Sequence, residues 1–250
     1  MSEAVNPLNP LPPVTLSEEN GVRYLHFGTS WIQGAMRIDD PEAVELEYVR
    51  QMMAWLLFIG QPQHIVQFGL GSGALAKCCY RHLPESRLTV VELNPAVIDI
   101  CRAQFLLPPD DARFAVKAQD ALAWLADAAN HGSADVLQVD LYDDKAEGPV
   151  FSSPEFYQAC ARCLTPRGML TVNLYGDEEI HLENIAALTE AFDAVVWLPL
   201  VDEENLVALA FKDSPSMDFA ELRARALAIR QQTGLEADKW VDGLQQWMYC

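Results

Sequence analysis

Two strand-like segments joined by a glycine-rich turn, within residues 65–92, most constrain what this chain can fold into. An apolar run beginning at Ile65 breaks into Gly69-Leu-Gly-Ser-Gly73, and a second apolar run, Leu88–Val91, ends on Glu92. The glycines permit a tight turn and a close approach of the backbone to a ligand. The acid after the second strand can accept hydrogen bonds from ribose hydroxyls. This layout predicts a nucleotide-binding βαβ unit.

The charge balance limits the partners of the chain. Its 250 residues include 36 acidic and 17 basic side chains, for a net charge of −19. Such a surface disfavours nucleic acid and anionic membranes and favours small cationic molecules. The first dozen residues lack the basic and then apolar pattern of a secretory signal, and no apolar run approaches the ~20 residues needed to span a bilayer. We therefore expect a cytoplasmic protein.

The pattern along the chain predicts four parts. Residues 1–12 are polar and proline-rich and are expected to be a disordered tail, and residues 13–40 carry two β-like runs that predict a small β-hairpin module. A Rossmann-like nucleotide-binding domain is expected over residues 41–215. Residues 216–250 are predicted to form C-terminal helices broken at Gly234.

Strand and helix patterns alternate within residues 41–215. Asp39 or Asp40 is expected to cap a helix that runs to Gly60. Five strands then follow with helices between them, which predicts a parallel sheet covered on both faces. The expected strands are 65–69, 88–92, 113–117, 135–140 and 168–174. A short acidic turn joins two more strands, 194–200 and 206–211, so these are predicted to form an antiparallel pair at the sheet end.

Acidic residues follow the third and fourth of these strands. Asp120 opens a helix with Ala121, where the carboxylate could accept from an adenine amino group, although Asp120 could equally cap the helix. Asp140 directly follows an apolar strand. Because parallel strands bind ligands at their carboxyl ends, the glycine loop, Glu92, Asp120 and Asp140 are expected to converge on one edge. A glycine loop with a following acid would also suit an NAD enzyme.

Four motifs lie along this pattern: Phe68-Gly-Leu-Gly-Ser-Gly73, Val91-Glu-Leu-Asn-Pro95, Gln119-Asp-Ala121 and Val139-Asp-Leu-Tyr-Asp143, the last followed by Gly148-Pro149 and Phe151-Ser-Ser-Pro-Glu-Phe-Tyr157. Together they resemble the motifs of the polyamine aminopropyltransferases, the spermidine and spermine synthases, and indicate a divergent spermidine synthase-like branch of the S-adenosylmethionine-dependent methyltransferase superfamily. The resemblance implies a mostly parallel seven-stranded sheet with an antiparallel end strand.

The resemblance also implies roles for individual residues and for partners. Asp140 is the expected catalytic residue, which positions the attacking amine and takes its proton. Decarboxylated or intact S-adenosylmethionine is the expected co-substrate, with a small cationic amine as acceptor, no permanently bound cofactor, no metal and a homodimeric assembly. The donor-binding residues are expected to be Gly69, Gly71, Ser72, Gly73, Glu92, Asp120 and Ala121, and the amine-binding residues Gln33, Tyr48, Tyr142 and Asp143.

The chain departs from the family pattern at several of these positions. Ser72 stands where the family loop has an acid that contacts the donor's amino group, and Arg50 would repel a cation if it faced the amine channel. Leu141 and Tyr142 replace small hydroxyl residues, and Asn173 replaces a glutamine. Two alternatives to aminopropyl transfer therefore stay open: a methyltransferase that uses intact S-adenosylmethionine, and a homodimeric nucleoside-binding protein without catalysis.

Overall fold

The computed structural model describes residues 11–143, 150–202 and 204–249. Ten residues of the predicted tail, 1–10, lie outside this part of the chain, as does the Gly148-Pro149 motif. Among the described residues, no helix is both long and apolar enough to cross a membrane.

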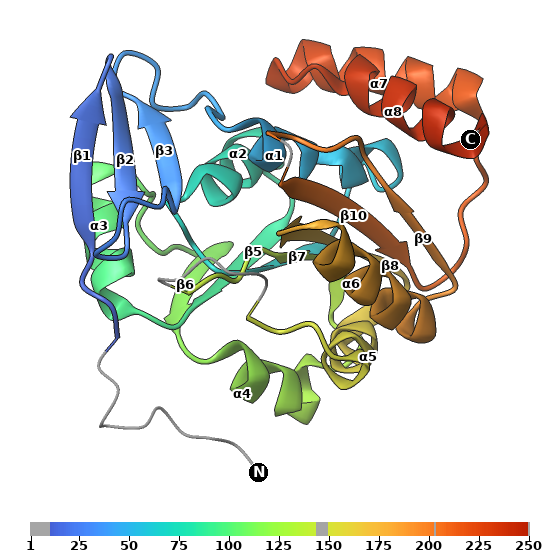
Figure 1. The fold of residues 1–250 in the computed structure, drawn as a ribbon, viewed down its shortest axis with the longest axis horizontal. Helices are drawn as coiled ribbons and strands as arrows, with labels where there is room; N and C mark the ends of the chain where they lie inside the picture. The colour runs from blue at the N-terminus through green and yellow to red at the C-terminus, as the bar shows by residue number, and fades with distance from the viewer. Residues whose placement is uncertain (1–10, 144–149, 203, 250) are drawn as a thin grey trace.

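The N-terminal module is a three-stranded antiparallel sheet in the order β1-β2-β3 (Figure 1). Its strands are β1 (Thr15–Glu19), β2 (Val22–His26) and β3 (Gly34–Arg37). Asn20 and Gly21 both have positive φ, 50° and 78°, so the β1–β2 hairpin turns through two residues in left-handed conformation. The expected hairpin strands correspond to β2 and β3. β1 is exposed at every residue and therefore carries no apolar alternation that would predict it.

The helix expected from Asp39 or Asp40 to Gly60 is wrong in its first half. The structure has a short α1 (Glu47–Gln51) and a 3₁₀ turn η1 (Ala54–Leu57). The carbonyl oxygens of Val44 and Glu45 accept hydrogen bonds from the Arg50 guanidinium, at 2.6 and 2.8 Å. The Lys77 ammonium donates a hydrogen bond to the Pro41 carbonyl oxygen at 2.7 Å. These side chains satisfy backbone groups that a longer helix would have paired within itself.

The main sheet has seven strands in the order β6-β5-β4-β7-β8-β10-β9. Only β10 runs antiparallel to its neighbours, so the predicted fold class is confirmed. The chain first builds outward from β4 to β6 and then returns to place β7 on the other side of β4, which creates a switch point between β4 and β7. The strands are β4 (His64–Phe68), β5 (Arg87–Glu92), β6 (Phe114–Ala118), β7 (Ala134–Val139), β8 (Leu164–Tyr175), β9 (Ala194–Trp197) and β10 (Asn205–Phe211).

Helices cover both faces of this sheet (Figure 1). One buried cluster joins the sheet to α1, η1, α2, α3, α7 and α8, and a second joins it to α4, α5 and α6. The remaining bounds are α2 (Ala74–His82), α3 (Pro95–Gln104), α4 (Ala121–Ala126), η2 (Ala128–Asn130), α5 (Pro154–Cys163), α6 (Glu178–Ala191), α7 (Phe219–Thr233) and α8 (Ala237–Tyr249). With the faces covered, the carboxyl edge of the strands is where ligands can enter.

Candidate active site

The glycine loop brings the carboxyl ends of three strands together. The Gly69 amide donates to the Val91 carbonyl at 2.9 Å, which ties the end of β4 to β5. Gly69 has φ of 83°, and a Cβ on it would overlap the carbonyl oxygen of Asp140 at the end of β7. A Cβ on Gly71 would lie 2.9 Å from the Gln33 carbonyl oxygen. Glycine is therefore required at both positions by close backbone approaches.

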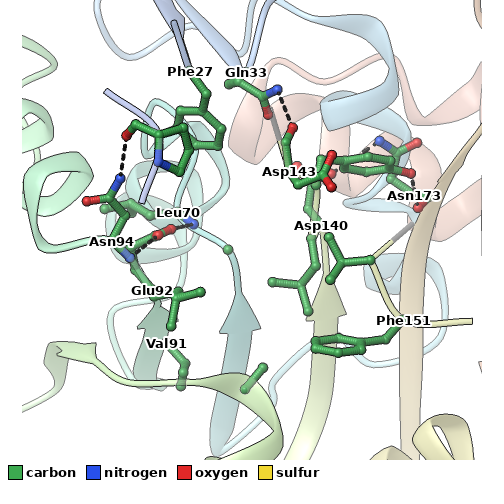
Figure 2. A pocket seen from close by; sticks show the side chains of 18 of the residues that line it. Phe27, Gln33, Leu70, Val91, Glu92, Asn94, Asp140, Asp143, Phe151 and Asn173 are labelled. Carbon is green, nitrogen blue, oxygen red and sulfur yellow. Dashed lines mark hydrogen bonds between the residues drawn. The ribbon is translucent and has the colours of Figure 1, made fainter. Parts of the chain in front are cut away.

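Glu92 holds the glycine loop from the end of β5. Its carboxylate accepts hydrogen bonds from the backbone amides of Leu70 and Asn94, at 2.9 and 2.8 Å. The side chain is buried, and burial raises the pKa of this carboxyl. Figure 2 shows the carboxylate between these two amides at the wall of the cavity. Each oxygen keeps a lone pair, so Glu92 can shape the loop and still accept from a ribose.

Asp120 caps helix α4, which is one of the two roles that the sequence suggests for it. Its Oδ1 accepts from the Ala123 amide at 3.0 Å and caps α4. Asp120 and Ala121 also line the cavity beside Glu92. The second carboxylate oxygen of Asp120 is not used by the cap.

Asp140 lies at the end of β7, at the switch point of the sheet. Its backbone amide donates to the Phe68 carbonyl at 3.0 Å, and its carboxylate accepts from Nδ2 of Asn173 at 3.2 Å and from the Tyr48 hydroxyl. Burial raises the pKa of the Asp140 carboxyl to about 6, and the two hydrogen bonds partly oppose this rise. A carboxylate with this pKa is ionised at neutral pH and is a better proton acceptor than an ordinary aspartate.

The segment after β7 closes the cavity from one side. The Tyr142 hydroxyl donates to the Asn173 carbonyl at 2.7 Å and accepts from the Tyr175 amide at 2.6 Å. Nε2 of Gln33 donates to the Asp143 carbonyl at 3.2 Å, so the loop before β3 touches the segment after β7 (Figure 2). The cavity, which is partly open to solvent, has a volume of about 280 Å³. The cavity therefore lies between the N-terminal module and the carboxyl ends of the main-sheet strands.

Comparison with known protein families shows to which family this chain belongs. The family described as the spermine/spermidine synthase domain matches residues 47–197, more than half of the chain. The chain belongs to this family. The polyamine aminopropyltransferase of Chromobacterium violaceum is 34% identical to it over 238 residues, which cover 94% of this chain and 90% of that protein.

Two further relatives agree with this assignment. The polyamine aminopropyltransferase of Neisseria meningitidis serogroup A is 32% identical over 237 residues, covering 94% of this chain and 89% of that protein. The solved structure of the spermidine synthase from Thermotoga maritima superposes with a TM-score of 0.65 at 14% identity, covering 92% of this chain and 84% of that one. The structural likeness supports the fold, and the sequence matches support the family.

Most residues that the sequence predicts for a spermidine synthase-like site line one cavity. Ten of the twelve do so: Gln33, Tyr48, Gly69, Gly71, Glu92, Asp120, Ala121, Asp140, Tyr142 and Asp143. Their backbones belong to the loop before β3, to α1, and to the ends of β4, β5, β6 and β7. Their individual roles in binding and catalysis stay predictions.

Ser72 and Gly73 do not line the cavity. Ser72 is 3% exposed, and its hydroxyl donates to the Ala35 carbonyl on β3 at 3.0 Å. Gly34 lies so close that a Cβ there would sit 2.5 Å from the Ser72 amide nitrogen. Gly73 is the left-handed N-cap of α2 and is buried. Packing of β3 onto the glycine loop thus directs the Ser72 hydroxyl to the N-terminal sheet, whereas Gly73 faces Leu107.

Arg50 also points away from the cavity, which removes the expected repulsion of a cation. Besides the two carbonyls of the 44–45 segment, its guanidinium contacts the Glu47 carboxylate at 3.0 Å. These three acceptors hold the guanidinium against the 44–47 segment, and the Glu47 carboxylate is its counter-charge there.

The structure adds cavity residues for which the sequence predicts no binding role, among them Asn173, which the sequence marks only as a replacement of the family's glutamine. Asn173 at the end of β8 is 3% exposed, and its Oδ1 has no hydrogen-bond partner among the described residues. Its place at a strand end would have been the signal, because the carboxyl-end rule applies to β8 as well as to β7. Leu11 and Pro12, within the predicted tail, line the cavity too, and the Pro12 carbonyl accepts from Nδ2 of Asn94 at 3.3 Å. No local pattern indicates that contact.

Proposed function

We propose that this chain transfers an aminopropyl group from decarboxylated S-adenosylmethionine to a di- or polyamine and releases methylthioadenosine. The observation that carries the proposal is the Asp140 carboxylate, held by Asn173 and Tyr48 beside the glycine loop, with its pKa raised to about 6. The relatives named polyamine aminopropyltransferases align along nearly the whole chain, which supports the same activity.

The electrostatics of the cavity suit a cationic donor. Glu92, Asp120, Asp140 and Asp143 line it, and the whole chain carries a net charge of −19. The donor bears a sulfonium and an ammonium, so these carboxylates favour its entry. The ribose and adenine would lie toward Glu92 and Asp120, since these residues follow the strands that carry the nucleotide in this fold. The reactive propyl chain would then extend toward Asp140.

The transfer step needs a free amine and a placed carbon. The lone pair of the amine nitrogen forms a bond to the propyl carbon next to the sulfonium. The carbon–sulfur bond breaks, its electron pair stays on sulfur, and methylthioadenosine leaves. The proton lost from the nitrogen passes to Asp140, a contribution of roughly 10²- to 10⁴-fold for a placed general base. Tyr48 donates to Asp140 and thereby orients the lone pair that takes the proton.

Product analysis tests the proposal. Purified protein would be incubated with decarboxylated or intact S-adenosylmethionine and with putrescine, cadaverine or spermidine, and the products would be identified by mass spectrometry. We expect aminopropyl adducts with the decarboxylated donor and a loss of at least 10²-fold in turnover in Asp140→Asn. Asp193→Asn is the matched control, because Asp193 is exposed and lies outside the cavity. Donor binding without any aminopropyl product would contradict the proposal.

The same experiment separates the two alternatives. A methyl adduct would indicate a methyltransferase, and a bound donor without any product would indicate a nucleoside-binding protein. The methyltransferase hypothesis drew on Ser72 leaving room for a donor carboxylate. The Ser72 hydroxyl instead bonds β3, and Ser72 does not line the cavity, so this argument loses its basis. The expected homodimer and cytoplasmic location stay predictions, and sedimentation analysis would check the first.

A further inference from the structure

The order of the strands in the sheet determines which residues line each end of the cavity. Glu92 and Asp120 follow β5 and β6, the glycine loop follows β4, and Asp140 follows β7. The next strands in the sheet are β8 and β10, whose ends contribute Asn173, Tyr175 and Asn205 to the same cavity. Under the proposed function the donor would occupy the side from β6 to β4, which leaves the space beyond Asp140, toward β8 and β10, for the acceptor.

A wall of aromatic rings stands on that acceptor side. The Tyr142 hydroxyl is fixed between the Asn173 carbonyl and the Tyr175 amide, at 2.7 and 2.6 Å, so the ring cannot swing aside without breaking both bonds. The Tyr175 ring meets Tyr142 edge-on, at 6.2 Å between centroids and 90° between planes. Trp31 also meets the Tyr175 ring edge-on, at 6.0 Å between centroids and 71° between planes.

The wall is supported from behind. The Tyr175 hydroxyl donates to the Glu204 carboxylate at 2.6 Å, and the Glu204 carbonyl accepts from the Gly176 amide at 3.0 Å. Because these bonds link the end of β8 to the turn before β10, they hold Tyr175 in place beside Tyr142. Tyr142 stands where the family pattern has a small hydroxyl residue, so its ring adds bulk that this pattern does not have at that position.

We infer that Tyr142 sets the maximum length of the amine acceptor, an inference that rests on the proposed aminopropyl transfer. The whole cavity, of about 280 Å³, lies near the lower limit of roughly 300 Å³ for pockets that hold one drug-sized ligand. An adenosyl donor bound along Glu92 and Asp120 would take up a large share of this volume. What remains beside Asp140 suits the end of a short aliphatic diamine, and Tyr142 excludes the extended chain of a longer diamine or a triamine.

Calorimetry on protein saturated with methylthioadenosine tests this inference without requiring turnover. The titrants are diamines with three to seven methylenes, and spermidine. We expect wild-type protein to bind 1,3-diaminopropane and putrescine at least ten-fold more tightly than 1,7-diaminoheptane. In Tyr142→Ser this ratio should fall at least ten-fold. Tyr142→Phe keeps the ring but loses both hydrogen bonds. Its affinity ratio should lie between those of wild type and Tyr142→Ser.

Controls separate this inference from folding and from the proposed function. Tyr157→Phe removes the 2.6 Å bond to Asn184 from a buried tyrosine outside the cavity and should leave the length ratio unchanged. Unchanged methylthioadenosine affinity would show that Tyr142→Ser is folded. If Tyr142→Ser does not fold, the affinity ratio of Tyr142→Phe is compared with that of wild type instead. A length ratio that is identical in wild type and both Tyr142 variants, or a failure of every amine to bind, would overturn the inference. A ratio that depends on Tyr142 without any aminopropyl product would refute the proposed function alone.

Discussion

Asn173 and Asp140, which are 33 residues apart, meet at the centre of the cavity, where the side-chain amide donates to the carboxylate at 3.2 Å. This bond stabilises the ionised form of Asp140 and so lowers a pKa that burial raises. The pKa of the proposed base therefore depends both on the burial of Asp140 after β7 and on the hydrogen bond from Asn173 on β8.

Asn173→Asp should move the acid limb of the rate profile to higher pH. The substitution keeps the size of the side chain, removes the donor and adds a like charge, and both changes raise the pKa of Asp140. Initial rates between pH 5 and 10 would show a wild-type midpoint near pH 6 and a variant midpoint at least one unit higher. Asn184→Asp, a buried site outside the cavity, is the control. An unmoved midpoint in Asn173→Asp would contradict the assignment of Asp140 as the base.

Asp140→Asn should stabilise the fold at pH 8 while lowering turnover. The carboxyl has a folded pKa of about 6 against an ordinary value of 3.8, so the folded state holds its proton more tightly than the unfolded chain does. Stability therefore falls as pH rises between these values and stays reduced above pH 6. Removing the charge should raise the free energy of unfolding at pH 8 by about 1–3 kcal/mol. Urea denaturation would detect this gain at pH 8 and little of it at pH 4, and an equal gain at both pH values would count against the pKa shift.

Glu92→Ala should weaken both the glycine loop and nucleoside binding. The change leaves the amides of Leu70 and Asn94 without their acceptor in a buried site, at about 1–3 kcal/mol for each unsatisfied group. We expect a lower free energy of unfolding by urea and a weaker calorimetric affinity for methylthioadenosine. Glu85→Ala, at an exposed acid before β5, should change neither. If stability and affinity both stay at wild-type values, the role of Glu92 in the loop is refuted.

Arg50→Met should lower stability without improving amine affinity. The guanidinium bonds two carbonyls and a carboxylate of the 44–47 segment, and hydrogen bonds to a charged group contribute about 1.5–3 kcal/mol each when well formed. Since the group is partly exposed, we expect a total loss near the lower end of this range. Thermal unfolding and the KM for putrescine are the measurements. A several-fold fall in that KM would mean that Arg50 does repel the amine.

The sequence alone was sufficient to predict the parallel sheet, the glycine loop and the strand-end acids. Each depends on a local pattern: an apolar run predicts a buried strand, and residues directly after such strands meet at one edge. Glu92, Asp120 and Asp140 line one cavity for this reason. The exposed strand β1 and the shortened α1 escaped prediction, because one has no apolar periodicity and the other is limited by the Arg50 and Lys77 side chains.

Only the tertiary structure decided how the remaining site residues are oriented. Ser72 lies within the most informative motif of the chain, yet β3 packs against it and directs its hydroxyl to Ala35, 37 residues away. Asn173 and Tyr142 acquire their places through bonds between β7 and β8 that span 33 and 31 residues. A local pattern records which residues follow a strand, but a side chain's direction depends on the segment that packs against it. That segment is brought there by the folded chain and not by neighbouring sequence.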